Sequence, residues 1–247
     1  MLLCAVVGLV LLVTGAWSLP RPPGSVHSAA PASGAAPAGS ATSSAPGPTA
    51  SSAGSDPTRT AGEARATLVP GSGPGSYEES SVAVASTTGK GRLYRFDVRV
   101  EKGLDLDPDD VGRALEKTLD DPRSWRSTGR VRFALVPAGQ PADLHAYLVT
   151  PGTTDKLCAP LLTRGEVSCR AGDKVVLNAK RWVFGAKAYG ADVAEYREYL
   201  ANHEIGHALG HSHVGCPRTG RPAPVMLQQT KGLQGCTANP WPSVTKG

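Results

Sequence analysis

Charged side chains are scarce in this sequence, and they form no basic run. Only 19% of the 247 residues are charged, and 26 Lys and Arg against 21 Asp and Glu leave a formal net charge of +5. Nucleic-acid-binding domains usually concentrate their Lys and Arg in a patch or stripe. A mild excess without such a run indicates a solvated cationic surface, so we expect no nucleic-acid partner.

The sequence also has no Cys-x-x-Cys pair, which argues against a zinc site built from cysteines. Of its five cysteines, Cys4 lies in an apolar N-terminal run and the other four lie in the C-terminal half. An even set of four in an exported protein predicts two disulfides. Three pairings are possible, and the simplest joins neighbours in the sequence, Cys158 with Cys169 and Cys216 with Cys236.

No Lys or Arg precedes the apolar run at residues 2–13, although a signal peptide usually begins with one. The run is long enough for a signal-peptide core, and residues 16–18 are suited to cleavage. The apolar stretch continues to Leu19, so at ~1.5 Å per residue it could also nearly cross a bilayer core of ~30 Å. We therefore interpret residues 1–19 as a signal peptide or a signal anchor, and as the only segment that contacts a membrane.

Residues 20–75 have the composition of an extended tether. Pro, Ala, Ser and Gly fill 42 of these 56 positions. Such a segment cannot bury enough apolar surface to offset its ordering entropy. We expect the folded domain at residues 76–247, where no internal repeat is present.

Strands and one helix are predicted in the first half of this domain. Residues 81–86 and 93–100 read as strands of a hairpin, because a turn-rich stretch with two glycines separates them. Asp107 and Pro108 are typical of a helix start, and Asp121-Pro122 of a helix end.

The second half is predicted to contain further strands, one long helix and an irregular end. Strands are expected at residues 131–136, 144–150, 166–169 and 174–179. Asp192 and Glu195 resemble a capping box, and Gly210 is the expected stop of a helix over residues 193–209. Together these elements predict an α+β fold.

The long helix ends in the segment HEIGHALGHSH at residues 203–213, which contains the candidate metal ligands and the candidate general base. His203 and His207 are four residues apart, so a helix presents both imidazoles on one face. Gly210 allows a sharp turn that can bring His213 to the same metal ion. Three protein ligands leave the fourth position of a tetrahedral zinc ion open, as in catalytic sites. Glu204, next to the first ligand, can act as a general base toward water.

This segment resembles the extended zinc signature HExxHxxGxxH of the metzincin metallopeptidases. In that family the three histidines bind zinc, the glutamate is the general base, and a turn containing a methionine passes beneath the metal. The resemblance implies that Met226, the only methionine besides the initiator, lies in that turn. It covers about residues 203–229 specifically, whereas the upstream elements agree only in their order. With its tether and four domain cysteines, the chain also resembles a family of exported bacterial metzincin-like proteins of unassigned function.

Two features of some metzincins are missing. Gln228 stands two residues after Met226, where some members carry an additional tyrosine ligand, so we expect no such ligand. No cysteine lies in residues 20–75, so we expect no latency through a cysteine. Among the other histidines, His211 is expected to face solvent or to support a ligand, and His145 to be a packed core residue.

We therefore expect a zinc-dependent metalloendopeptidase with a twisted mixed sheet, a backing helix, the active-site helix and an irregular C-terminal part. Its cofactor would be Zn²⁺, its substrate a peptide or protein, and its cleft would lie between a sheet edge and the zinc. We expect a monomer that acts outside the cytoplasm, either secreted or tethered by its N-terminal segment. Two alternatives stay open: a catalytically silent, zinc-stabilised cell-surface binding module, and a cell-wall peptide hydrolase.

Overall fold

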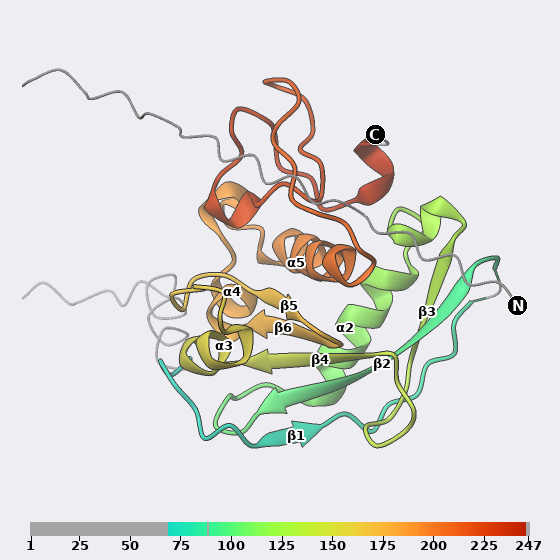
Figure 1. Ribbon diagram of the computed structural model, residues 1–247, viewed down its shortest axis with the longest axis vertical. Coiled ribbons are helices and arrows are strands. Elements are labelled where there is room, and N and C mark those ends of the chain that lie inside the picture. Colours follow the sequence, from blue (N-terminus) through green and yellow to red (C-terminus); the bar gives the residue numbers. More distant parts are fainter. Residues whose placement is uncertain (1–68, 88, 246–247) are drawn as a thin grey trace, which may run out of the picture. The chain divides into compact units, whose positions relative to one another are not determined.

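The computed structural model describes residues 69–87 and 89–245, which form one mixed β-sheet with helices against both faces (Figure 1). The predicted signal segment at residues 1–19 and the tether as far as residue 68 lie outside the described residues. Within the described part, none of the helices has the length and apolar character needed to cross a membrane.

The sheet confirms the expected α+β class. Its six strands are β1 (Tyr77–Glu79), β2 (Arg92–Glu101), β3 (Val131–Leu135), β4 (Leu144–Val149), β5 (Cys169–Ala171) and β6 (Lys174–Asn178). Their order is β1-β2-β4-β6-β5, and β3 pairs with β2. Strands β2, β3, β4 and β6 pair in parallel, whereas the short strands β1 and β5 are antiparallel to their neighbours.

The predicted hairpin between residues 81–86 and 93–100 is wrong. Strand β3 pairs in parallel with residues 92–96, the half of β2 that the hairpin would need. Residues 81–86 do not pair with β2. Of these residues only Val84 forms a bridge, an isolated antiparallel one with Leu135 of β3. Asp109 of the following helix also holds the start of this segment, because it accepts hydrogen bonds from the backbone N–H and the hydroxyl of Ser81. The alternating pattern of residues 81–86 reflects this partial contact with the core.

The two predicted helices are confirmed as α2 (Pro108–Asp120) and α5 (Val193–Ala208). Asp107 caps α2 by accepting a hydrogen bond from the Asp109 backbone N–H at 2.8 Å. Asp192 does the same for α5, with the Glu195 backbone N–H as donor at 2.8 Å. Each cap satisfies a backbone donor that has no partner inside its helix.

Two short helices were not predicted, and one strand lies later than expected. The helices are α3 (Pro151–Cys158) and α4 (Ala179–Phe184), and 3-10 turns lie at η1 (Trp125–Thr128), η2 (Lys187–Tyr189), η3 (Gln229–Lys231) and η4 (Pro242–Thr245). We expected a strand at residues 166–169, but β5 begins only at Cys169. Its position is set by Gly172, which at φ 66° turns the chain so that β5 pairs with β6. Both helices are shorter than three turns, so their apolar periodicity is brief.

The core lies between one face of the sheet and helices α2 and α5. Leu115 of α2 and Leu200 of α5 pack with Val98 and Leu148 of the central strands in one apolar cluster. A smaller cluster on the opposite face joins α3 to the sheet through Cys158 and its neighbours. Helix α5 is thus packed against the sheet, which gives the histidines near its end a rigid support.

The segment that leads into the domain is hydrogen-bonded to it. Residues 69–75, which the composition assigns to the tether, include Gly71, whose carbonyl accepts from the Gly152 backbone N–H at 2.8 Å. The backbone N–H of Gly75 donates to the buried carboxylate of Glu101 at 2.8 Å. Glu101 also accepts from the backbone and hydroxyl of Thr150 and from the hydroxyl of Thr153. This carboxylate therefore ties the first described residues to the end of β2 and the start of α3.

Candidate metal centre

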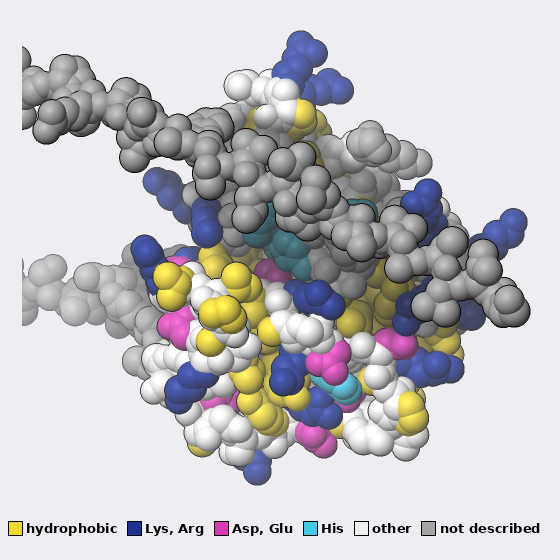
Figure 2. All heavy atoms as spheres, in the orientation of Figure 1, with side chains coloured by type: hydrophobic (Ala, Val, Ile, Leu, Met, Phe, Trp, Pro, Cys, Tyr) yellow, Lys and Arg dark blue, Asp and Glu magenta, His cyan; other side chains and the backbone are white. Residues whose placement is uncertain are grey.

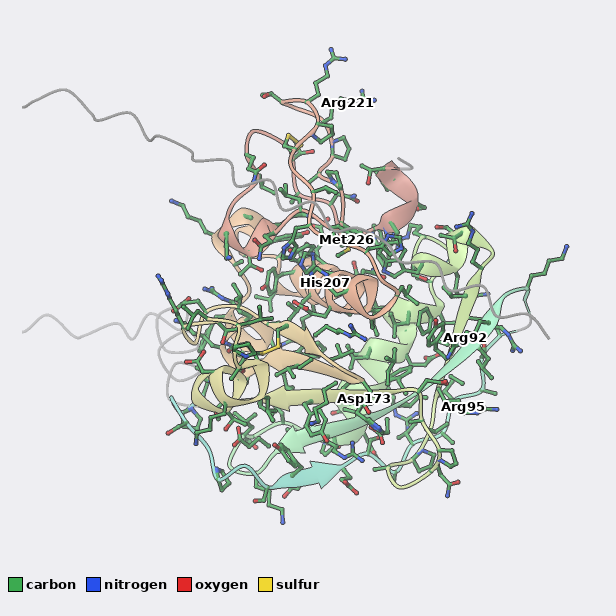
Figure 3. All side chains as sticks on the ribbon, in the orientation of Figure 1. Arg92, Arg95, Asp173, His207, Arg221 and Met226 are labelled. Carbon is green, nitrogen blue, oxygen red and sulfur yellow. A yellow bond between two sulfur atoms is a disulfide. The ribbon has the colours of Figure 1, made fainter. Side chains whose placement is uncertain are left out.

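The end of α5 and the turn after it bring three histidines together. His203 and His207 are on α5, and Gly210 at φ 94° turns the chain back after the helix. His213 follows this turn, so that ligand atoms of His203, His207 and His213 all lie within 4.8 Å of one another. The three predicted ligands therefore form one cluster, on the side of the sheet where α5 lies (Figure 3).

Backbone carbonyl groups fix the orientation of two of the rings. Nδ1 of His203 lies 2.8 Å from the Val225 carbonyl oxygen, and Nδ1 of His207 lies 2.8 Å from the His211 carbonyl oxygen. A carbonyl only accepts, so both Nδ1 atoms carry the proton and both Nε2 atoms offer a lone pair. Such second hydrogen bonds are typical of histidines that bind metals.

The spacing and the charge state of these imidazoles fit a zinc ion. Nε2 of His207 and Nε2 of His213 are 3.0 Å apart. Two nitrogens bound tetrahedrally at ~2.05 Å would lie about 3.3 Å apart, so little movement is needed. Burial lowers the pKa of His203 to about 3, and burial is also the main cause that lowers the pKa of His207 and His213. The rings are therefore neutral near pH 7, which is the form that binds metal.

Glu204 presents a buried carboxylate beside this cluster. Its side chain is 4% exposed, and its Oε2 atom has no hydrogen-bond partner among the described residues. Burial raises its pKa to about 8. An unpaired buried carboxyl group is energetically costly, and a nearby cation would favour its charged form. Glu204 is therefore an ionisable group without a hydrogen-bond partner for Oε2 among the described residues, next to the three imidazoles.

Met226 packs directly against α5 at Gly206. A Cβ atom at Gly206 would lie 2.4 Å from Met226 Sδ and 2.7 Å from Cζ2 of Trp125, so only glycine fits this helix position. The preceding residue, Val225, is the one whose carbonyl holds His203. Met226, a buried member of the main apolar cluster, thus lies against the helix that carries His203 and His207 (Figure 3).

Buried polar groups hold the chain around Met226. The hydroxyl of Tyr199 donates to the Leu227 carbonyl at 2.9 Å and accepts from the Gln229 backbone N–H at 2.8 Å. The Gln229 side chain accepts from the hydroxyl of Tyr189 at 2.9 Å and from the Asn239 backbone N–H at 3.1 Å. Because every partner is fixed, this network positions the loop that carries the Val225 carbonyl.

Both disulfides of the simplest pairing are present. Cys158 joins Cys169, linking α3 to β5, and Cys216 joins Cys236 across the segment that contains Met226. Disulfides of this kind are typical of an oxidising, extracytoplasmic environment.

A cleft of about 330 Å³ opens over the histidines. Its lining comprises Leu161, Leu162, Thr163, Val167, Ser168, Cys169, Arg170, Tyr199, His203, Glu204, His207, His213, Gln228, Thr230 and Lys231. Strand β5 forms one wall, and the loop before it places Leu162, which is 83% exposed, at the rim. In the space-filling view, histidine side chains reach the surface next to cationic ones (Figure 2).

The other two candidate histidines lie outside the cluster, and Asn202, next to His203, has a structural role. His211 stacks on Trp125, with ring centroids 4.3 Å apart. His145 lies on β4, is only half-buried, and pairs with the buried Asp97, its Nδ1 atom 2.9 Å from the carboxylate, so it is not the packed core residue that we expected. The Asn202 side chain donates to the Pro240 carbonyl and supports the C-terminal segment.

These features define an α+β protein with a three-histidine cluster that could hold a metal ion. The model of the family described as "Protein of unknown function (DUF3152)" matches residues 66–242, and the chain belongs to this family. No curated protein and no solved structure matches the chain.

Proposed function

We propose that this protein is a zinc-dependent metallopeptidase of the metzincin type. One observation carries the proposal: three imidazoles, two of them oriented by backbone carbonyl groups, meet at the floor of an open cleft beside the unpaired carboxyl group of Glu204. A structural zinc site is normally closed by four protein ligands, whereas this cluster has three. A purely structural zinc site also has no need of a buried carboxylate without a partner, such as that of Glu204.

Glu204 would carry the proton transfers. A bound zinc ion would supply Lewis-acid chemistry that polarises a substrate carbonyl and makes water more acidic. The Glu204 carboxylate would accept a proton from the water as the water oxygen bonds to the carbonyl carbon of the substrate. It would then deliver that proton to the amine nitrogen as the C–N bond breaks. The carbonyl groups of Val225 and His211 would keep the rings of His203 and His207 fixed during these steps.

Strand β5 supports an extended peptide as the substrate. Among the described residues it pairs only with β6, through Cys169–Ala171, and it also lines the cleft. A peptide can add to such an edge through main-chain hydrogen bonds. The peptide would then pass over the histidines with one carbonyl near the cluster.

Zinc content and peptide hydrolysis of the full chain test the proposal, with wild type beside Glu204→Gln. We expect one zinc ion per chain in both proteins and a loss of at least about 100-fold in hydrolysis for the variant, because general acid–base catalysis contributes that much. Glu198→Gln is the matched control, since it makes the same change on the same helix outside the cleft lining. Zinc-loaded Glu204→Gln with wild-type activity would refute the mechanism, and zinc without hydrolysis in every protein would favour a binding module.

The proposed site of action is outside the cytoplasm. The two disulfides support it, as does the composition of residues 20–75, which suits a tether. The protein would be secreted or held at the cell envelope by its N-terminal segment.

A further inference from the structure

Two cations without an acidic partner flank the histidine cluster. Arg170 is on β5 and Lys231 is at the end of η3, and both line the cleft. Among the described residues neither makes an ion pair, and the Lys231 ammonium group has only a 3.4 Å hydrogen bond to the neutral side chain of Gln228. Both residues are exposed, so their charges are available to a ligand.

The pleat of β5 directs Arg170 toward the histidines. Neighbouring side chains on a strand point to opposite faces. Cys169 points to the face covered by α3, where it forms its disulfide with Cys158, so Arg170 points to the face of α5. Arg170 and His207 line the same cleft, which agrees with this placement.

No carboxylate within the cleft offsets these cations, apart from Glu204. Among the described lining residues, Glu204 is the only acidic one. The adjoining hollow adds Arg164, Glu166 and Arg181, but Glu166 is already paired with Lys180 and Arg181. The hollow therefore extends the excess of positive charge instead of cancelling it.

Such unpaired cations contribute little to folding, because exposed charges are well solvated. They create a positive potential in a partly enclosed site, where field lines are focused onto a ligand. We propose that the cleft selects acidic peptides, with an aspartate or glutamate side chain close to the bond that is cleaved. Arg170 and Lys231 are the residues that determine this preference. This inference rests on the proposed peptidase function for the cleavage step, but not for the binding step.

Matched peptide libraries test the preference. One library carries glutamate at its central position, the other carries the isosteric glutamine, and all remaining positions are randomised. For the zinc-loaded wild-type chain we expect kcat/KM to be about 2- to 30-fold higher for the glutamate library, because two exposed charge pairs together contribute ~0.4–2 kcal/mol. The preference should shrink in 1 M salt, where the Debye length is only ~3 Å.

Arg170→Gln and Lys231→Gln should each reduce this ratio, and the double variant should bring it close to one. Arg221→Gln is the matched control, because it removes the same charge from an exposed loop far from His207 (Figure 3). It should keep the wild-type ratio. Equal kcat/KM for the two libraries in the wild-type protein would overturn the inference.

A binding measurement separates this inference from the proposed function. Fluorescence anisotropy of both labelled libraries with zinc-loaded Glu204→Gln reports affinity without cleavage. If no protein cleaves either library, tighter binding of the glutamate library that is lost in Glu204→Gln/Arg170→Gln would uphold the acidic preference while the peptidase proposal fails. Cleavage with equal affinities and equal rates for both libraries would support the peptidase proposal and overturn the acidic preference.

Discussion

Gly206→Ala tests whether the close approach of Met226 to α5 supports the metal centre. The substitution adds one methyl group inside a helix, where alanine is the better helix former by about 1 kcal/mol. Helix propensity alone therefore predicts a more stable protein. The packing around Gly206 predicts the reverse, so the two effects can be told apart by sign.

The packing effect should be the larger of the two. The added Cβ would lie 2.4 Å from Met226 Sδ and 2.7 Å from Trp125 Cζ2. Met226 can adjust, but Trp125 is held by a 2.8 Å hydrogen bond from its Nε1 to the Asn202 carbonyl and by stacking on His211. Overpacking of this kind costs about 1–3 kcal/mol, and the rigid tryptophan favours the upper end. After the gain in helix propensity, we expect a net loss of about 1–2 kcal/mol in the free energy of unfolding.

Thermal unfolding of the apo protein measures this loss. For a domain of this size, a loss of 1–2 kcal/mol should lower Tm by about 2–8 °C. Gly112→Ala in α2 is the matched control, because its Cβ would meet Leu135 Cδ2 at 3.1 Å and the Ser80 hydroxyl oxygen at 3.2 Å. These contacts are tight without being severe, so the control should change the free energy of unfolding by less than about 1 kcal/mol.

Zinc affinity gives a second measure of the same effect. Displacement of Met226 should move the Val225 carbonyl, which orients His203, so Gly206→Ala should also bind zinc more weakly. A Gly206→Ala protein that is at least as stable as wild type, with unchanged zinc affinity, would refute the role assigned to this close approach.

The sequence predicts well those parts of the structure that depend on local signals. The caps Asp107 and Asp192 define both long helices, and the spacing of His203 and His207 requires only that α5 is helical. The turn at Gly210, which brings His213 back, is also a local feature. For these residues a few neighbours in the chain decide the conformation.

The parts that depend on distant partners could not be predicted in this way. The alternation in residues 81–86 fits a strand, but β3, more than forty residues later, occupies the relevant half of β2. Arg170 appears in the sequence as one more exposed cation, and only the β5–β6 pairing turns it toward His207. The role of Gln229 depends on a partner ten residues away and another forty residues away, and no periodic signal marks it. Such roles arise from tertiary contacts alone.

Two further predictions concern the supports of the fold. Replacing both Cys216 and Cys236 with alanine opens a disulfide loop with a sequence separation of 20, which should lower the free energy of unfolding by about 3 kcal/mol in the chain-entropy model. Urea unfolding with and without reductant checks this: the difference should be present without reductant and vanish when both proteins are reduced, since reductant opens both disulfides in wild type. Glu101→Gln tests the buried carboxylate, whose two oxygens accept only from N–H and O–H donors, among them those of Gly75 and Thr150. The new amide group would face a donor, so we expect a loss of about 2–4 kcal/mol at pH 7. Burial alone would raise the pKa of Glu101, but these hydrogen bonds outweigh it and lower the pKa below 4.5. A lowered carboxyl pKa stabilises the folded state above the unfolded-state pKa, and this contribution is lost as the pH falls through the folded-state value. The difference in the free energy of unfolding between wild type and Glu101→Gln should therefore be largest at neutral pH. It should begin to shrink as the pH falls below about 4.5, as measured by urea unfolding across this range. A gap of constant size from pH 7 down to pH 3 would show that folding does not lower the pKa of Glu101.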